Sequence, residues 1–155
     1  MSTVKSPLRE EARTAVGKAL QASLVDLLDM ALTAKQAHWN ITGRNFRSLH
    51  LQLDEIVEFA REHADSVAER AVAIGVNPDG RASTIAQSTR IPQLEAGYLQ
   101  DDKVIAAFTD LLGQVIHRFR ERIAATEEAD LVTQDLFIEI TAGLEKQYWM
   151  LSVQN

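Results

Sequence analysis

Apolar residues recur at helical spacing along most of the 155-residue chain. From about Leu8 to His38 they fall three or four positions apart, which is typical of a helix with one buried face. Three further stretches have the same period: Asn45 or Phe46 to Ile74, Asp101 to Ala125, and Asp130 to Val153. No alternation of apolar and polar residues extends beyond a few positions, so the pattern predicts an all-α protein with four long helices.

One connection between these helices is much longer than the others. Gly43 marks a short turn after the first helix, but residues 75–100 form a 26-residue segment that contains Pro78 and Pro92. A helix of about 29 residues is roughly 43 Å long, and such a segment can return along that length. We therefore expect the second and third helices to run parallel, in the ferritin-like four-helix bundle with one long crossover. A short helical piece is expected at Ile91–Tyr98 within that crossover.

Composition narrows the function classes. Cysteine is absent, which excludes disulfide scaffolds, thiol catalysis and zinc–thiolate sites. Sixteen basic and 22 acidic residues give a net charge of −6, which disfavours binding to nucleic-acid phosphates. No apolar run has the roughly 18 residues of a membrane span, and residues 1–10 do not resemble a signal peptide. We expect one domain over residues 1–155, with residues 1–7 as a short N-terminal tail, in a cytoplasmic protein.

The second helix carries a set of polar residues that does not face the predicted core. His50, Asp54, Asp65 and Glu69 lie at about 0°, 40°, 60° and 100° around the helix, whereas its apolar residues cluster near 280°. No histidine of the chain follows a glutamate by three positions, so an inward-facing di-iron site of the Glu-x-x-His type is not encoded. The simplest alternative is a solvated helix face without chemistry.

The spacing of the four residues suggests a second copy of the chain. Each i, i+4 pair can touch one ion, but Asp54 and Asp65 are about 16 Å apart along the helix. Both Asp54 with Asp65 and His50 with Glu69 have their midpoint at position 59.5. Two antiparallel copies related by a dyad there would form two equal sites, each with one imidazole and three carboxylates. This ligand set suits iron(II) or manganese, and zinc is an alternative occupant.

Other residues extend this prediction. His38 ends the first helix, and the short turn after it can bring its imidazole close to His50. The same dyad would pair Glu58 with Arg61 of the second copy. His63 and His117 have no comparable companions, so they are interpreted as packing or surface residues.

These residues resemble the signature of the Dps family, the bacterial miniferritins. The resemblance runs through His38-Trp-Asn-Ile-Thr-Gly-Arg-Asn-Phe-Arg-Ser-Leu-His50, then Asp54, then Asp65-Ser-Val-Ala-Glu69. It implies a hollow dodecamer with ferroxidase centres at its two-fold interfaces. His38, His50 and Asp54 would come from one subunit, and Asp65 and Glu69 from its neighbour.

The resemblance also implies an activity. Iron(II) would be oxidised, preferably by hydrogen peroxide, and stored as ferric mineral inside the shell, which protects the cell against oxidative stress. Trp39 resembles the aromatic residue that traps stray oxidising equivalents, and a packing role is its alternative. Asp130, Asp135 and Glu139 resemble the acidic residues that line the family's three-fold pores, and Asp130 is also expected to be the N-cap of its helix.

Two other functions remain as alternatives. Many members of the family bind and compact DNA through Lys-rich tails, which would place the protein at the nucleoid. This chain has only Lys5 and Arg9 near its start and no basic run near its end, so DNA binding is expected to be weak or absent. The third hypothesis is a helical bundle with a purely structural role.

Overall fold

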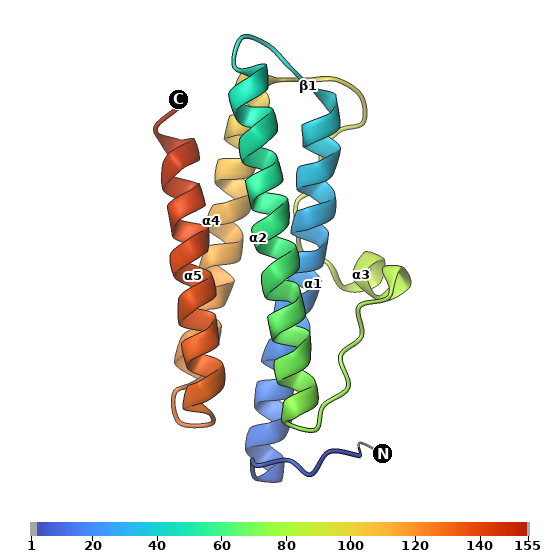
Figure 1. The fold of residues 1–155 in the computed structure, drawn as a ribbon, viewed down its shortest axis with the longest axis vertical. Coiled ribbons are helices and arrows are strands. Elements are labelled where there is room, and N and C mark those ends of the chain that lie inside the picture. The colour runs from blue at the N-terminus through green and yellow to red at the C-terminus, as the bar shows by residue number, and fades with distance from the viewer. Residues whose placement is uncertain (1–2, 155) are drawn as a thin grey trace.

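The computed structural model describes residues 3–154, so residues 1–2 of the predicted tail lie outside the described residues. Four long helices form the bundle: α1 (Glu10–Asn40), α2 (Phe46–Ala73), α4 (Asp101–Thr126) and α5 (Leu131–Ser152). Figure 1 shows that α2 and α4 run in the same direction, joined by a segment that returns along the outside of α1. The all-α, ferritin-like bundle with a long crossover is therefore confirmed. No helix within residues 3–154 combines the length and the apolar character of a membrane span.

The crossover does contain a short helix, but not where we expected it. Helix α3 spans Ala82–Ser88, whereas the predicted segment Ile91–Tyr98 is irregular. The Asp79 carboxylate accepts hydrogen bonds from the Arg81 backbone and the Thr84 hydroxyl at the start of α3. Ile91 is buried, its backbone N–H donates to the Thr89 hydroxyl, and its backbone oxygen accepts from the Gln93 side chain. The prediction at Ile91–Tyr98 was wrong because local side-chain hydrogen bonds outweighed a weak apolar pattern.

The turn between α1 and α2 is tied to the end of the crossover. Strands β1 (Ile41–Thr42) and β2 (Leu99–Gln100) pair in parallel. The Asp101 carboxylate accepts a hydrogen bond from the backbone of Asn45. Gly43 has φ +125°, and a Cβ there would lie 2.4 Å from the Asp101 carboxylate, so only glycine fits. This arrangement fixes the end of the hairpin that carries the candidate histidines.

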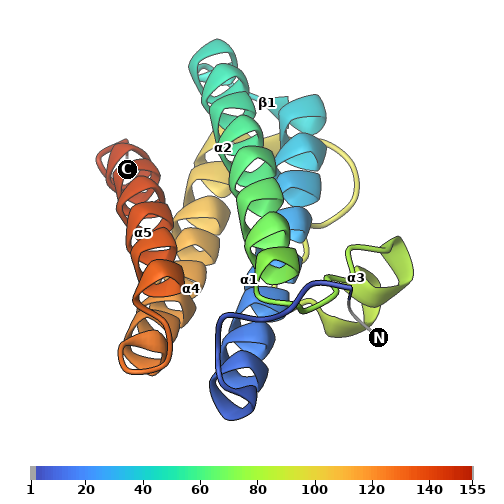
Figure 2. The same cartoon turned by 60° about the horizontal axis from the view of Figure 1, so that its bottom comes forward.

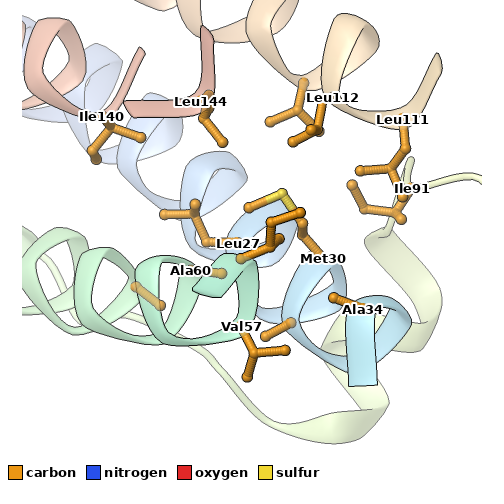
Figure 3. Close-up of a cluster of buried hydrophobic side chains, with 14 of the residues drawn as sticks. Leu27, Met30, Ala34, Val57, Ala60, Ile91, Leu111, Leu112, Ile140 and Leu144 are labelled. Carbon is orange, nitrogen blue, oxygen red and sulfur yellow. The ribbon is translucent and has the colours of Figure 1, made fainter. Parts of the chain in front are cut away.

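A single cluster of buried apolar side chains links the helices (Figure 3). Leu27 and Met30 of α1 lie between Val57 and Ala60 of α2 on one side and residues of α4 and α5 on the other. The view turned by 60° shows α1 and α2 side by side, with α4 and α5 as a second pair (Figure 2). Since α2 contributes its apolar face to this core, its polar face is directed away from the bundle.

Candidate metal centre

Two histidines meet where α1 and α2 join. The rings of His38 and His50 stack with centroids 3.6 Å apart and planes at 17°. Nδ1 of each ring lies 2.8 Å from the backbone oxygen of the other histidine. A carbonyl oxygen only accepts, so both Nδ1 atoms carry a proton, and in a neutral ring the lone pair is then on Nε2. This is the tautomer that an imidazole needs to ligate a metal through Nε2.

Asp54 lies one helical turn after His50 and completes this cluster. Its Oδ1 is 3.3 Å from Nδ1 of His38 and 2.5 Å from Nζ of Lys35. The hydrogen bond from Lys35 is the main cause that holds the pKa of Asp54 below its ordinary value, with further lowering by the two histidines. The carboxylate is therefore charged at neutral pH and available to a cation, but an ammonium group occupies one of its oxygens.

Lys35 was not among the predicted site residues. It lies three positions before His38, so both side chains emerge from the same face of α1. The i, i+3 spacing was a signal that sequence reasoning could have used. Lysine does not ligate cations at neutral pH, so a pattern of metal-ligand residue types did not include it.

The acidic pair Asp65 and Glu69 lies elsewhere on α2. Both side chains are exposed, and neither has a hydrogen bond or ion pair among residues 3–154. Eleven residues of helix separate Asp65 from Asp54, which is about 16 Å. Residues 3–154 do not gather three His, Asp or Glu side chains in a metal-binding arrangement. His38, His50 and Asp54 are neighbours, but on their own they are not arranged to hold an ion, and Asp65 and Glu69 face solvent.

Neighbouring residues follow the same face. Trp39 is 66% exposed, so it is not part of the core of this chain. Phe46 stacks on His50 with ring centroids 5.0 Å apart and supports its orientation. Glu58 and Arg61, near the predicted dyad, are exposed and form no ion pair within the described part of the chain.

The remaining histidines fit their predicted packing and surface roles. The His63 ring contacts Phe59, with centroids 4.3 Å apart. The exposed His117 lies 3.3 Å from Glu121, one turn along α4. Neither residue lies with the His38–His50 pair, so the predicted centre gains no ligand from them.

The three candidate pore residues, Asp130 at the N-cap of α5 and Asp135 and Glu139 within it, differ in their surroundings. Asp130 is buried and caps the helix by accepting a hydrogen bond from the Val132 backbone, as predicted. It also accepts hydrogen bonds from the Thr133 hydroxyl and from Arg70 at 2.6 Å. Burial alone would raise the pKa of Asp130, but these hydrogen bonds hold it below its ordinary value. Asp135 and Glu139 are exposed and, unlike Asp130, have no hydrogen bond or ion pair within residues 3–154.

The family model of the ferritin-like domain matches residues 17–154. Together with the crossover bundle, this match defines a ferritin-like protein. The chain is similar to DNA protection during starvation protein 2 of Deinococcus radiodurans, with 37% identity over 86% of this chain. It spans only 56% of that relative's length. The DNA protection during starvation protein of Mycolicibacterium smegmatis is 33% identical, over 93% of this chain and 79% of the relative.

Solved structures agree with these relatives. A Dps structure from Mycobacterium smegmatis superposes with a TM-score of 0.93 at 32% identity, covering 99% of this chain and 93% of that one. Dps from Microbacterium arborescens in the high iron form gives a TM-score of 0.92 at 32% identity, covering 97% and 98%. The chain belongs to the Dps family.

Proposed function

We propose that this protein oxidises iron(II) at centres shared by two chains and stores the ferric product in a hollow shell. The observation that supports this most strongly is the division of α2 into two half-sites. One half holds two oriented imidazoles and a charged carboxylate, and the other holds two exposed carboxylates with no partner in the described part of the chain. Neither half alone offers an ion enough ligands.

A two-fold axis near position 59.5 would join these halves. His38, His50 and Asp54 of one chain would then face Asp65 and Glu69 of the other, and each dimer would have two such centres. Nitrogen and carboxylate ligands suit iron(II), with zinc or manganese as substitutes. A relative of this chain has been described in a high iron form, which supports iron as the substrate.

Each group has a specific part in this mechanism. The two Nδ1–H···O=C hydrogen bonds hold the imidazoles so that Nε2 of each can bind iron(II) without reorganisation. Lys35 neutralises Asp54 in the free protein and is displaced as a cation arrives. Two iron(II) ions give one electron each to hydrogen peroxide, which takes up two protons and yields two waters. This two-electron step avoids release of hydroxyl radical, and the exposed Trp39 ring can donate an electron to stray oxidant.

Iron also has to reach the centre and leave it as mineral. We propose that twelve chains form the shell and that Asp135 and Glu139 line its three-fold pores, where rings of carboxylates concentrate cations. Asp130 is less suited to this role because Arg70 and the helix end already occupy its carboxylate. The resulting protein would protect the cytoplasm against iron and peroxide together.

Optical measurement of iron(II) oxidation by peroxide tests this proposal. Loss of the groups that hydrogen-bond to a metal ligand typically lowers metal affinity or activity by about 10–100-fold. We expect His50→Ala, which removes a ligand itself, to lower the initial rate by at least as much. His117→Ala, a histidine on the opposite hairpin, should leave the rate unchanged. Light scattering should show a multimer for all three proteins. Equal rates for wild type and His50→Ala would contradict the proposal and favour a helical bundle with a purely structural role.

DNA binding is the second candidate, because the relatives are named for DNA protection. Charge argues against it, since twelve copies at −6 each give −72 for the shell. A gel-shift assay at low salt, with and without divalent ions, distinguishes the two functions. We expect no metal-free retardation of duplex DNA, and clear retardation would favour the DNA-binding role.

A further inference from the structure

A cavity of about 690 Å³ lies between the N-terminal half of α1, the crossover with α3, and the end of α4. Its α1 residues end at Asp26, twelve residues before His38, which is about 18 Å along the helix. It is therefore separate from the candidate metal centre. Small-molecule sites commonly have volumes of about 300–1,000 Å³, so this cavity is large enough for a metabolite.

The walls of this cavity are held in place. The Gln21 side chain donates to the backbone oxygen of Asp79 and accepts from its backbone N–H, both at 2.9 Å, which clamps the crossover against α1. Gly17 lies under Val76, whose side chain would be 2.9 Å from a Cβ there. The space is thus preformed rather than a gap in a loose loop.

Positive charge gathers in the cavity although the chain is acidic overall. Four of its lining residues are basic: Arg13, Lys18, Arg90 and Arg122. Its two acids are already neutralised, because the Asp26 carboxylate binds Arg118 and Arg122 and the Asp79 carboxylate binds Arg81. Arg122 shares Asp26 with Arg118, but Arg13, Lys18 and Arg90 form no ion pair within residues 3–154, so an excess of positive charge remains.

Arg122 has unused hydrogen-bonding capacity in this position. Its Nη2 donates to Asp26 at 2.7 Å, but Nη1 is buried and has no hydrogen-bond partner. Burial is the main cause that lowers the pKa of Arg122, and the charges of Arg118 and Arg90 lower it further. A buried donor without an acceptor is costly, and an anion beside it would remove that cost.

The rest of the lining is uncharged, and Ala22, Val25 and Val76 give it an apolar part beside polar side chains such as Gln21 and Asn77. We propose that the cavity binds a small organic anion. Its carboxylate or phosphate accepts hydrogen bonds from Arg122 and Arg90, and its apolar body lies against the two valines. This pairing of a charged head with an apolar body uses both kinds of surface that the cavity offers.

Calorimetric titration of the assembled protein tests the proposal, with three ligands that share a naphthalene ring and differ in their polar group. 1-Naphthoate carries a carboxylate, 1-naphthyl phosphate carries a phosphate, and 1-naphthylmethanol is neutral. We expect saturable binding of at least one anion, with one site per chain and at least about tenfold weaker binding of the alcohol. The ratio of the two anions identifies the preferred head group, and inorganic phosphate alone should compete only weakly.

Variants place the binding in this cavity. Arg122→Gln and Arg90→Gln should each weaken the anion at least about tenfold, and Ala22→Trp should block it by filling space. Arg90 is exposed, so its variant tests the charge without touching the buried Asp26 cluster. Arg120→Gln is the matched control, because the Arg120 side chain pairs with Glu145 outside the cavity.

Iron oxidation should stay unchanged in Arg90→Gln. No saturable binding, equal binding of the alcohol, or full affinity in Arg90→Gln and Ala22→Trp would overturn the proposal.

Discussion

The two halves of α2 carry ligands of similar chemistry in opposite states. Near its start, His50 and Asp54 are held by His38 and Lys35 through short contacts. Near its end, Asp65 and Glu69 extend into solvent with no partner within residues 3–154. Contacts within the chain hold the first half in place, whereas no such contact within residues 3–154 holds the side chains of the second half.

This contrast indicates where a partner has to act. A preorganised half-site binds without paying much conformational entropy, because its rotamers are already fixed. Exposed carboxylates are well hydrated, and they give up that water only for a cation and its other ligands. The difference therefore predicts that the organised half contributes to both stability and activity, whereas the exposed half contributes to activity alone.

The largest expected effect comes from removing a ligand of the exposed half. Glu69→Gln should lower the rate of iron(II) oxidation by about 10–100-fold, as much as His50→Ala, because both remove one ligand of the same centre. The two variants should differ in metal-free stability. Glu69→Gln should lie within about 0.5 kcal/mol of wild type, as is usual for exposed positions. Stopped-flow absorbance and thermal unfolding measure the two quantities. Full activity in Glu69→Gln would remove the exposed half from the centre.

Removing a carboxylate that is already bound within the chain should lower stability and leave the oxidation rate unchanged. Asp130→Ala removes a helix cap and the carboxylate that pairs with Arg70 Nη2, which should cost about 2 kcal/mol. The thermal midpoint should fall by about 4–8 °C, with the oxidation rate per centre unchanged. Asp110→Ala on the surface of α4 is the control and should have little effect. An unchanged midpoint in Asp130→Ala would show that the cap and ion pair do not stabilise the protein.

The stability lost in Asp130→Ala should also depend on pH. The pKa of Asp130 is lower in the folded protein than in the unfolded chain, so its contribution is fully present above the unfolded value of about 3.9. It is lost as the pH falls through the folded pKa. The difference in midpoint between wild type and Asp130→Ala should therefore be constant near neutrality and should shrink below about pH 4. A difference that grows on acidification would contradict this assignment.

The smallest effect is expected at Lys35. Lys35→Met keeps the aliphatic stem but removes the ammonium that competes for Asp54. Because partly exposed ion pairs contribute at most about 1 kcal/mol, half-saturation should occur at up to about fivefold lower iron(II) concentration. Lys146→Met, at an exposed position on α5, serves as the control. A higher iron(II) requirement in Lys35→Met would mean that Lys35 assists iron binding.

The sequence predicted most of the fold because the helices are long and periodic. The bounds of α2 and α4 were placed within a few residues, and Gly75, with φ +79°, ends α2 where expected. The short helix in the crossover was misplaced. Seven residues are too few for a periodic signal, and the Asp79 hydrogen bonds that start α3 depend on tertiary placement.

The candidate site was predictable to a different degree in its two halves. The approach of His38 to His50 followed from the short turn between their helices, but the reciprocal hydrogen bonds and the Lys35 contact did not. The assignment of Asp65 and Glu69 depended on symmetry arithmetic and on the family resemblance, and it remains a prediction because it concerns a second chain. Helical periodicity shows which face a residue occupies but not what covers that face.

Mixing two inactive variants tests the shared centre most directly. His50→Ala and Glu69→Gln are refolded together in equal amounts, and iron(II) oxidation by peroxide is measured on the reassembled protein. In a mixed dimer, the intact His50 of one chain meets the intact Glu69 of the other, so one of its two centres is wild type. With random pairing, about a quarter of all centres are restored, and activity should return to about a quarter of the wild-type value. Activity no higher than that of the separate variants would contradict a centre built from two chains.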